Sequence, residues 1–64
     1  MRLTDFWLRM ERVFGPGYAE SVARDQVIAA LGGRTAMEAL AAGEAAKDVW
    51  RAVCEAFQVP PRER

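Results

Sequence analysis

The side chains that could do chemistry in this chain are one cysteine, Cys54, and several carboxylates at helical spacing, because the sequence contains no histidine. Most nucleophilic and acid–base schemes on protein scaffolds use histidine, so a Cys/His pair is impossible within this chain. Cys54 lies beside Val53 and Phe57 in an amphipathic pattern, where burial raises the pKa of a thiol and lowers its reactivity. We therefore predict a structural cysteine, no catalytic residues and no enzyme activity.

Paired carboxylates are the remaining route to acid–base catalysis. Glu44, Asp48 and Glu55 have suitable spacing, but Lys47 and Arg51 are interleaved with them, which is typical of a solvent-exposed, salt-bridged helix face. A single cysteine without histidine is too few ligands for a zinc site, and the acids are too scattered for a calcium loop. We predict no metal and no cofactor.

The turn Gly32-Gly33-Arg34-Thr35 precedes a helical pattern and could cradle an anion at a helix N-terminus. It lacks the lysine and the spacing of a nucleotide-binding loop, and it is expected to follow a helix rather than a strand. Thr35 and Glu38 form the signature of a capping box, in which each side chain bonds to the other residue's backbone amide. We therefore favour a helix end followed by a helix start.

A helix-turn-helix in the second half is the sharpest functional candidate. Ala39, Gly43 and Val49 have the spacing of a small residue in the first helix, a turn glycine and a branched apolar lock. Any tight pair of helices needs similar residues, so the match is also explained by packing alone.

The DNA-binding alternative predicts nucleic-acid contacts by Arg34, Lys47 and Arg51. Asp48 and Glu55 share the solvent face of the same last helix and would face phosphates or base edges unfavourably. Interaction with another protein is accordingly the leading hypothesis.

Four short helices must position these residues. Apolar periodicity and capping signals predict helices over residues 5–14, 16–31, 35–42 and 45–57. The second helix is expected to kink or break near Arg24-Asp25, because its apolar residues do not share one face, and Asp25 could cap a new start. The fold class is therefore all-α, a compact bundle of about four short helices that is orthogonal rather than a long coiled coil. We expect one helical domain over 1–60 and a disordered tail over 61–64.

The first and last helices carry the apolar stripes expected to form the core. They comprise Leu3, Phe6, Trp7, Met10, Val13 and Phe14, and Val49, Trp50, Val53 and Phe57. Thr4 is the expected N-cap of the first helix, and Val49-Trp50 is expected to pin the second half against the Trp7 stripe. Leu8 falls about 150° from the centre of that stripe. A single exposed leucine is usually an ordinary surface residue. Its functional interpretation is a contact with a partner.

Composition limits the remaining possibilities. The chain has 64 residues and zero net charge, which allows one small domain. The single cysteine and the absence of a signal-peptide pattern favour the cytoplasm, and no stretch is apolar enough to span a membrane. In the ion pairs expected along the helices, acidic and basic side chains neutralise each other's charge, so we expect no basic face. These pairs are Asp5–Arg9, Glu20–Arg24, Glu44–Lys47, Asp48–Arg51 and Arg51–Glu55.

Several segments together resemble a small actinobacterial family of unknown function. They are residues 1–7, Phe14-Gly15-Pro16, Leu31-Gly32-Gly33-Arg34-Thr35, the run 38–43 and the run 49–55. The resemblance implies a short, single-domain, cytosolic protein whose gene tends to lie near those of the recombinase and its regulator. It brings no established catalytic or binding residues. Family members often carry a basic residue where Leu8 stands and an aromatic residue where Val22 stands.

Overall fold

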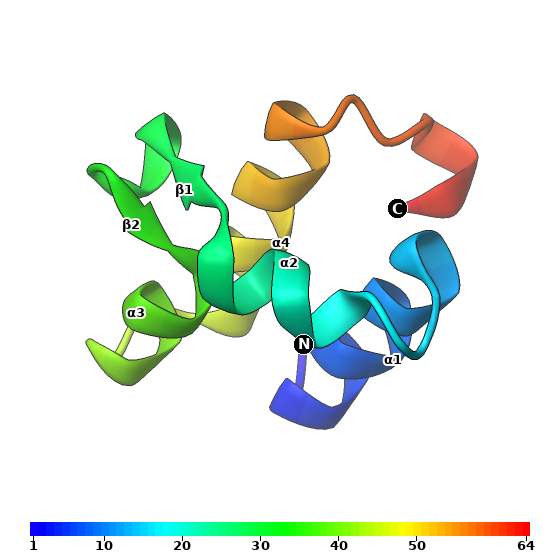
Figure 1. Cartoon of the computed structure of the whole chain (residues 1–64), viewed down its shortest axis with the longest axis horizontal. Coiled ribbons are helices and arrows are strands. Elements are labelled where there is room, and N and C mark those ends of the chain that lie inside the picture. Colours follow the sequence, from blue (N-terminus) through cyan, green and yellow to red (C-terminus); the bar gives the residue numbers. More distant parts are fainter.

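The computed structural model, which describes residues 1–64, contains four α-helices and a small antiparallel hairpin that lies at one side of the molecule (Figure 1). The elements in chain order are α1 (Leu3–Phe14), α2 (Ala19–Asp25), β1 (Val27–Ile28), the 3₁₀ turn η1 (Ala29–Leu31), β2 (Arg34–Thr35), α3 (Ala36–Ala41), α4 (Ala46–Ala56) and the 3₁₀ turn η2 (Pro61–Glu63). Figure 1 shows short helices that point in different directions, with the hairpin next to α4.

The hairpin corrects the all-α prediction, because the fold is mostly helical with a two-stranded sheet. Val27 pairs with Thr35 and Ile28 pairs with Arg34. The predicted break near Arg24-Asp25 in the helical pattern over residues 16–31 is confirmed, because α2 ends at Asp25. Asp25 does not cap a new helix, and residues 27–28 form β1 instead. Two β-branched residues in β1 favour the extended conformation. Positive φ angles of 74° and 78° at Gly32 and Gly33, which glycine adopts without steric cost, reverse the chain into β2.

Helix α1 begins earlier than expected. Its N-cap is Arg2, whose backbone amide donates a 3.3 Å hydrogen bond to Oδ2 of Asp5. Thr4 was predicted to cap the helix and instead lies within its first turn. The carboxylate of Asp5 therefore serves the helix start, and the predicted ion pair with Arg9 does not form.

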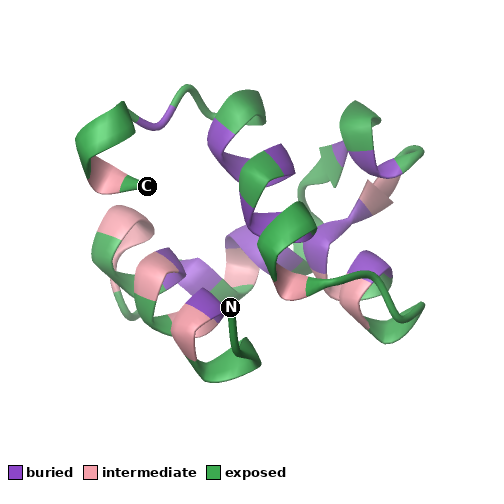
Figure 2. Cartoon of the chain, turned by 180° about the vertical axis from the view of Figure 1, so that it is seen from behind, coloured by how far each residue is buried: buried purple, intermediate pink, exposed green.

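The core includes buried residues of all four α-helices, and α1 packs against α4 within it. Phe6 and Met10 are fully buried, and Trp50 is 4% exposed. The rings of Phe6 and Trp50 pack edge to face with centroids 6.1 Å apart, a favoured aromatic geometry. Buried residues line the inner faces of the helices (Figure 2). Trp50 therefore joins the second half to the first helix, as predicted, with Phe6 as its aromatic contact.

Two expected core residues lie at the margin. Leu3 is 52% exposed and Phe57 is 38% exposed, because each lies at the outer end of its helix. The ring of Phe57 still packs edge to face on the half-buried Phe14, with centroids 5.3 Å apart. Leu8 is 64% exposed, which confirms its predicted position outside the stripe.

The end of α4 is closed by a left-handed residue that is not glycine. Gln58 has a φ of 54°, and the Val59 amide donates a 2.9 Å bond to the Cys54 carbonyl. The Gln58 amide donates to Glu55 at 3.4 Å. These two bonds define a Schellman motif, which directs the buried Val59 back onto the core.

The segment after this motif folds back towards α1. Pro61–Glu63 forms the 3₁₀ turn η2, where the sequence predicted a disordered tail. Figure 1 shows the carboxyl-terminal segment near the end of α1. Nη1 of Arg9 donates a 2.7 Å hydrogen bond to the main-chain oxygen of Arg64, which brings residues from opposite ends of the chain together.

Candidate functional site

The larger of two surface hollows lies between α1 and α4 and has a volume of about 320 Å³. We call it the Trp50 pocket. Its lining comprises Met1, Arg9, Lys47, Trp50, Arg51, Cys54, Glu55 and Arg64. Four of these side chains are cationic, from α1, α4 and the last turn, and only Glu55 is anionic. The fold therefore gathers positive charge from elements that are separated in the sequence.

The apolar part of the pocket belongs to the core. Trp50 and Cys54 are 4% and 1% exposed. The indole Nε1 of Trp50 donates a 3.3 Å hydrogen bond to the main-chain oxygen of Arg64, and Nε of Arg64 donates to the Val59 carbonyl at 2.9 Å. The main-chain oxygen of Arg64 thus accepts hydrogen bonds from two donors, Nη1 of Arg9 on α1 and Nε1 of Trp50 on α4.

Cys54 is buried in the core, which is the usual environment of a structural cysteine. Burial raises the pKa of Cys54, while the positive charges of Arg64 and Arg9 oppose that rise. The thiol is therefore kept protonated near neutral pH, and a protonated thiol is a poor nucleophile.

The cations of the pocket are weakly neutralised. Lys47 has no ion-pair partner within 4.0 Å, and Arg51 pairs with Asp48 at 3.8 Å with both side chains more than half exposed. Such exposed pairs contribute little energy, whereas a hollow lined mainly by cations concentrates the positive field. The prediction that no basic surface forms is therefore wrong at this pocket.

The predicted helical ion pairs explain that error. Glu20–Arg24 and Asp48–Arg51 form at 3.7 and 3.8 Å, as predicted. The pairs Asp5–Arg9, Glu44–Lys47 and Arg51–Glu55 do not form. Glu44 instead binds the guanidinium of Arg34, so Lys47 is left free to line the pocket.

The structure separates the three predicted nucleic-acid contacts. Lys47 and Arg51 share the Trp50 pocket. Nε of Arg34 donates a 2.8 Å bond to the Leu31 carbonyl, and its Nη2 binds Glu44. Arg34 thus braces the hairpin against the α3–α4 turn. Sequence analysis missed Arg9 and Arg64, which have no local spacing that links them to α4.

The proposed helix-turn-helix residues have clear packing roles. Ala39 and Val49 are fully buried, and Gly43 has a φ of 95° between α3 and α4. The Gly43 amide donates to the Leu40 carbonyl and the Glu44 amide donates to the Ala39 carbonyl, both at 3.1 Å. This is a second Schellman motif, and it makes a tight corner between two packed helices.

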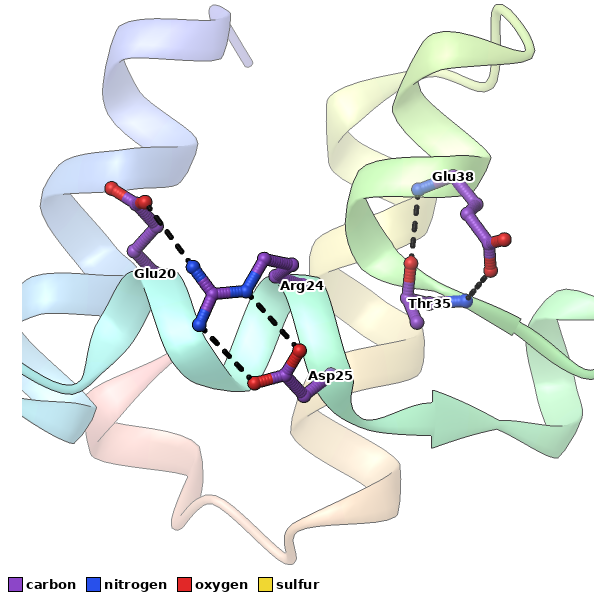
Figure 3. A network of polar contacts seen from close by, with 5 residues as sticks. All are labelled: Glu20, Arg24, Asp25, Thr35 and Glu38. Atoms are coloured by element: carbon purple, nitrogen blue, oxygen red, sulfur yellow. Dashed lines mark hydrogen bonds and ion pairs between the residues drawn. The ribbon is translucent and has the colours of Figure 1, made fainter.

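The glycine-rich turn before α3 leads into a helix cap. The Thr35 amide donates to Oε1 of Glu38 at 2.8 Å, and the Glu38 amide donates to Oγ1 of Thr35 at 3.1 Å (Figure 3). The predicted capping box is confirmed. The turn follows β1 and η1, which corrects the expectation that it follows a helix.

A second polar cluster closes α2 (Figure 3). Arg24 binds Glu20 one turn earlier, and its Nε donates to the neighbouring Asp25 at 3.2 Å. The hydrogen bond and charge of Asp25 raise the pKa of Arg24 further above its usual value. These side chains are satisfied among themselves on an exposed surface, so we assign the cluster no binding role.

The smaller hollow lies at the junction of α1, α2 and α3. It has a volume of about 210 Å³ and is lined by Trp7, Glu11, Pro16, Ala19, Glu20 and Met37. Its two charged residues, Glu11 and Glu20, are both acidic. Trp7 therefore lines an acidic hollow, whereas Trp50 lines a mainly basic one. No Cys, Asp and Glu side chains gather in threes as metal ligands would.

The fold and its pockets define a small, mostly helical domain with a charged cleft between its first and last helices. No helix is long and apolar enough to cross a membrane. Residues 1–62 match the family described as protein of unknown function DUF3046, and the chain belongs to this family. No curated protein and no solved structure matches the chain significantly.

Proposed function

We propose that this chain is a non-enzymatic protein-interaction module that works in the cytoplasm without metal or cofactor. The Trp50 pocket is the observation that carries the proposal. Its cations come from three separate elements and surround a core tryptophan, with a single carboxylate among them. Arginine is enriched at protein interfaces, and a concave pocket with an excess of positive side chains favours encounter with an oppositely charged partner.

Leu8 is the apolar contact that we propose for the same partner. It projects from α1 with 64% of its surface exposed and precedes Arg9 of the pocket in the sequence.

The proposal is tested by competitive capture from a native lysate. Tagged full-length protein is immobilised, and specific partners are those displaced by excess untagged protein. We expect at least one protein that is displaced in this way and that forms a complex with the purified chain in size-exclusion chromatography. If every captured protein is insensitive to the competitor, the interaction-module proposal is wrong.

A DNA-binding accessory factor linked to recombination or repair is the second candidate. The α3–α4 corner with buried Ala39 and Val49, together with Lys47 and Arg51 at one pocket, supports it. The engagement of Arg34 by Leu31 and Glu44 counts against it. Phosphate contacts produce a steep fall of affinity with salt, so a titration of duplex DNA at increasing salt tests this candidate. Absence of binding at about 50 mM salt removes it.

A further inference from the structure

We propose that the Trp50 pocket binds carboxylate side chains from an acidic segment of a protein partner. This inference rests on the proposed interaction function and names the chemistry that its partner presents. Four of the lining side chains are cationic and one is anionic, so the side-chain charges favour an anionic occupant. Arginine and lysine form short, charge-assisted hydrogen bonds with carboxylates, which are stronger than bonds between neutral groups.

The donors in the pocket are already arranged for an oxygen acceptor. Nη1 of Arg9 and Nε1 of Trp50 converge on the Arg64 main-chain oxygen at 2.7 and 3.3 Å. A guanidinium carries five N–H donors and an ammonium carries three. Arg9 therefore retains donors beyond this bond, and Lys47 has no ion-pair partner. We assign the ligand carboxylate to these remaining donors.

The shape of the pocket favours acidic side chains over a nucleic-acid backbone. Its cations converge on one hollow of about 320 Å³, whereas duplex DNA presents a closely spaced row of charges. A phosphate row laid along α4 would meet the exposed carboxylates of Asp48 and Glu55. A single glutamate or aspartate side chain in the pocket meets one lining carboxylate, Glu55, and four lining cations.

The test uses the full chain, labelled with ¹⁵N, and a blocked hexaglutamate peptide at about 150 mM salt, where distant charges are screened. The two indole N–H signals separate the hollows, because Trp50 lines the basic pocket and Trp7 lines the acidic hollow. We expect saturable shifts of the Trp50 indole and of the Lys47 and Arg51 amides, with little change at Trp7. Absence of shifts up to about 10 mM peptide, or shifts centred on Trp7, overturns the proposal.

Matched charge reversals locate the site. Lys47→Glu is expected to weaken hexaglutamate binding about fivefold, and the neutral Lys47→Gln about twofold. Arg12→Glu makes the same charge change on an exposed helical residue outside the pocket and is expected to leave the affinity nearly unchanged. Equal weakening by Lys47→Glu and Arg12→Glu would show general charge attraction and overturn the assignment. All variants are first shown to melt cooperatively, and Lys47→Gln alone suffices if the reversal does not fold.

Two further arms separate the possible outcomes. Inorganic phosphate and duplex DNA are titrated in the same way, and DNA that hexaglutamate cannot displace assigns the pocket to nucleic acid instead. A captured partner that binds Lys47→Glu as well as the native chain overturns the pocket assignment and leaves the interaction function standing. Hexaglutamate binding at Trp50 with no competable partner supports the carboxylate site and contradicts the interaction function.

Discussion

Replacing Trp50 by alanine tests the central packing feature of the fold. The indole is 4% exposed, and its ring packs edge to face on Phe6. A buried aromatic side chain removes about 150–250 Å² from water. At about 25 cal/mol per Å² this corresponds to roughly 4–6 kcal/mol as an upper estimate. Allowing for the area that alanine still buries, we expect Trp50→Ala to lower the free energy of unfolding by about 3–5 kcal/mol.

This loss is large for so small a domain. Globular proteins have about 0.05–0.15 kcal/mol of stability per residue, which gives a total of about 3–10 kcal/mol for a chain of this length. Trp50→Ala is therefore expected to leave the chain largely unfolded or close to its transition at room temperature. Loss of the Trp50 side chain should affect both halves together, because it packs α4 against α1.

Urea unfolding followed by far-ultraviolet circular dichroism measures the effect without depending on tryptophan fluorescence. Trp50→Phe keeps an aromatic ring next to Phe6 and loses the indole bond to Arg64, so we expect a cost of about 1–2 kcal/mol. Trp7 is half-buried, and Trp7→Ala should cost less than Trp50→Ala. A Trp50→Ala protein with a cooperative transition within about 1 kcal/mol of the native one would refute the packing described for α4.

The remaining predictions concern a helix end, a corner, a surface residue and a thiol. Gln58 has a left-handed φ of 54°, so Gln58→Gly should stabilise the protein by about 0.5–1 kcal/mol. Gly43 has a φ of 95°, so Gly43→Ala should destabilise the protein by about 1 kcal/mol. Thermal melts measure both, and a stabilising Gly43→Ala would contradict the corner geometry. Leu8→Ala should change the free energy of unfolding by less than about 0.5 kcal/mol. It should weaken binding of the captured partner about fivefold, as measured by calorimetry. Unchanged affinity would show that Leu8 does not lie in the interface. Burial raises the pKa of Cys54 above its usual value, so the folded state holds the thiol proton more tightly than the unfolded state does. Stability should therefore fall as pH rises from the pKa of the thiol in the unfolded chain towards its higher pKa in the folded state. Cys54→Ala should flatten this decline in urea titrations, and an identical slope in both proteins would show that the thiol does not cause it.

The parts of the fold that were predicted correctly depend on local chemistry. Thr35 and Glu38 satisfy each other's amides within four residues, and the buried stripe of α4 repeats at helical spacing. The hairpin was missed because Val27, Ile28 and Leu31 also suit a helix by period. Tertiary packing decides between the two, since Ile28 and Leu31 are buried while Val27 is 65% exposed.

The candidate site was predicted only where its residues share one helix. Lys47 and Arg51 are four residues apart on α4, so their proximity follows from helical geometry. Arg9 and Arg64 are separated by 55 residues and are brought together by a hydrogen bond. No spacing rule links them, because their contact depends on how η2 folds back towards α1. The basic pocket is thus a property of the tertiary structure.

The zero net charge of the chain is compatible with a basic pocket because the fold uses its acids internally. Asp5 and Glu38 accept backbone amides at the starts of α1 and α3, which removes them from competition for cations. Glu44 is bound by Arg34, across the hairpin and the α3–α4 turn. The use of Asp5 and Glu44 in this way leaves their expected partners, Arg9 and Lys47, without the predicted ion pairs. Helix capping and hairpin bracing therefore determine where positive charge remains, and in this fold it remains between α1 and α4.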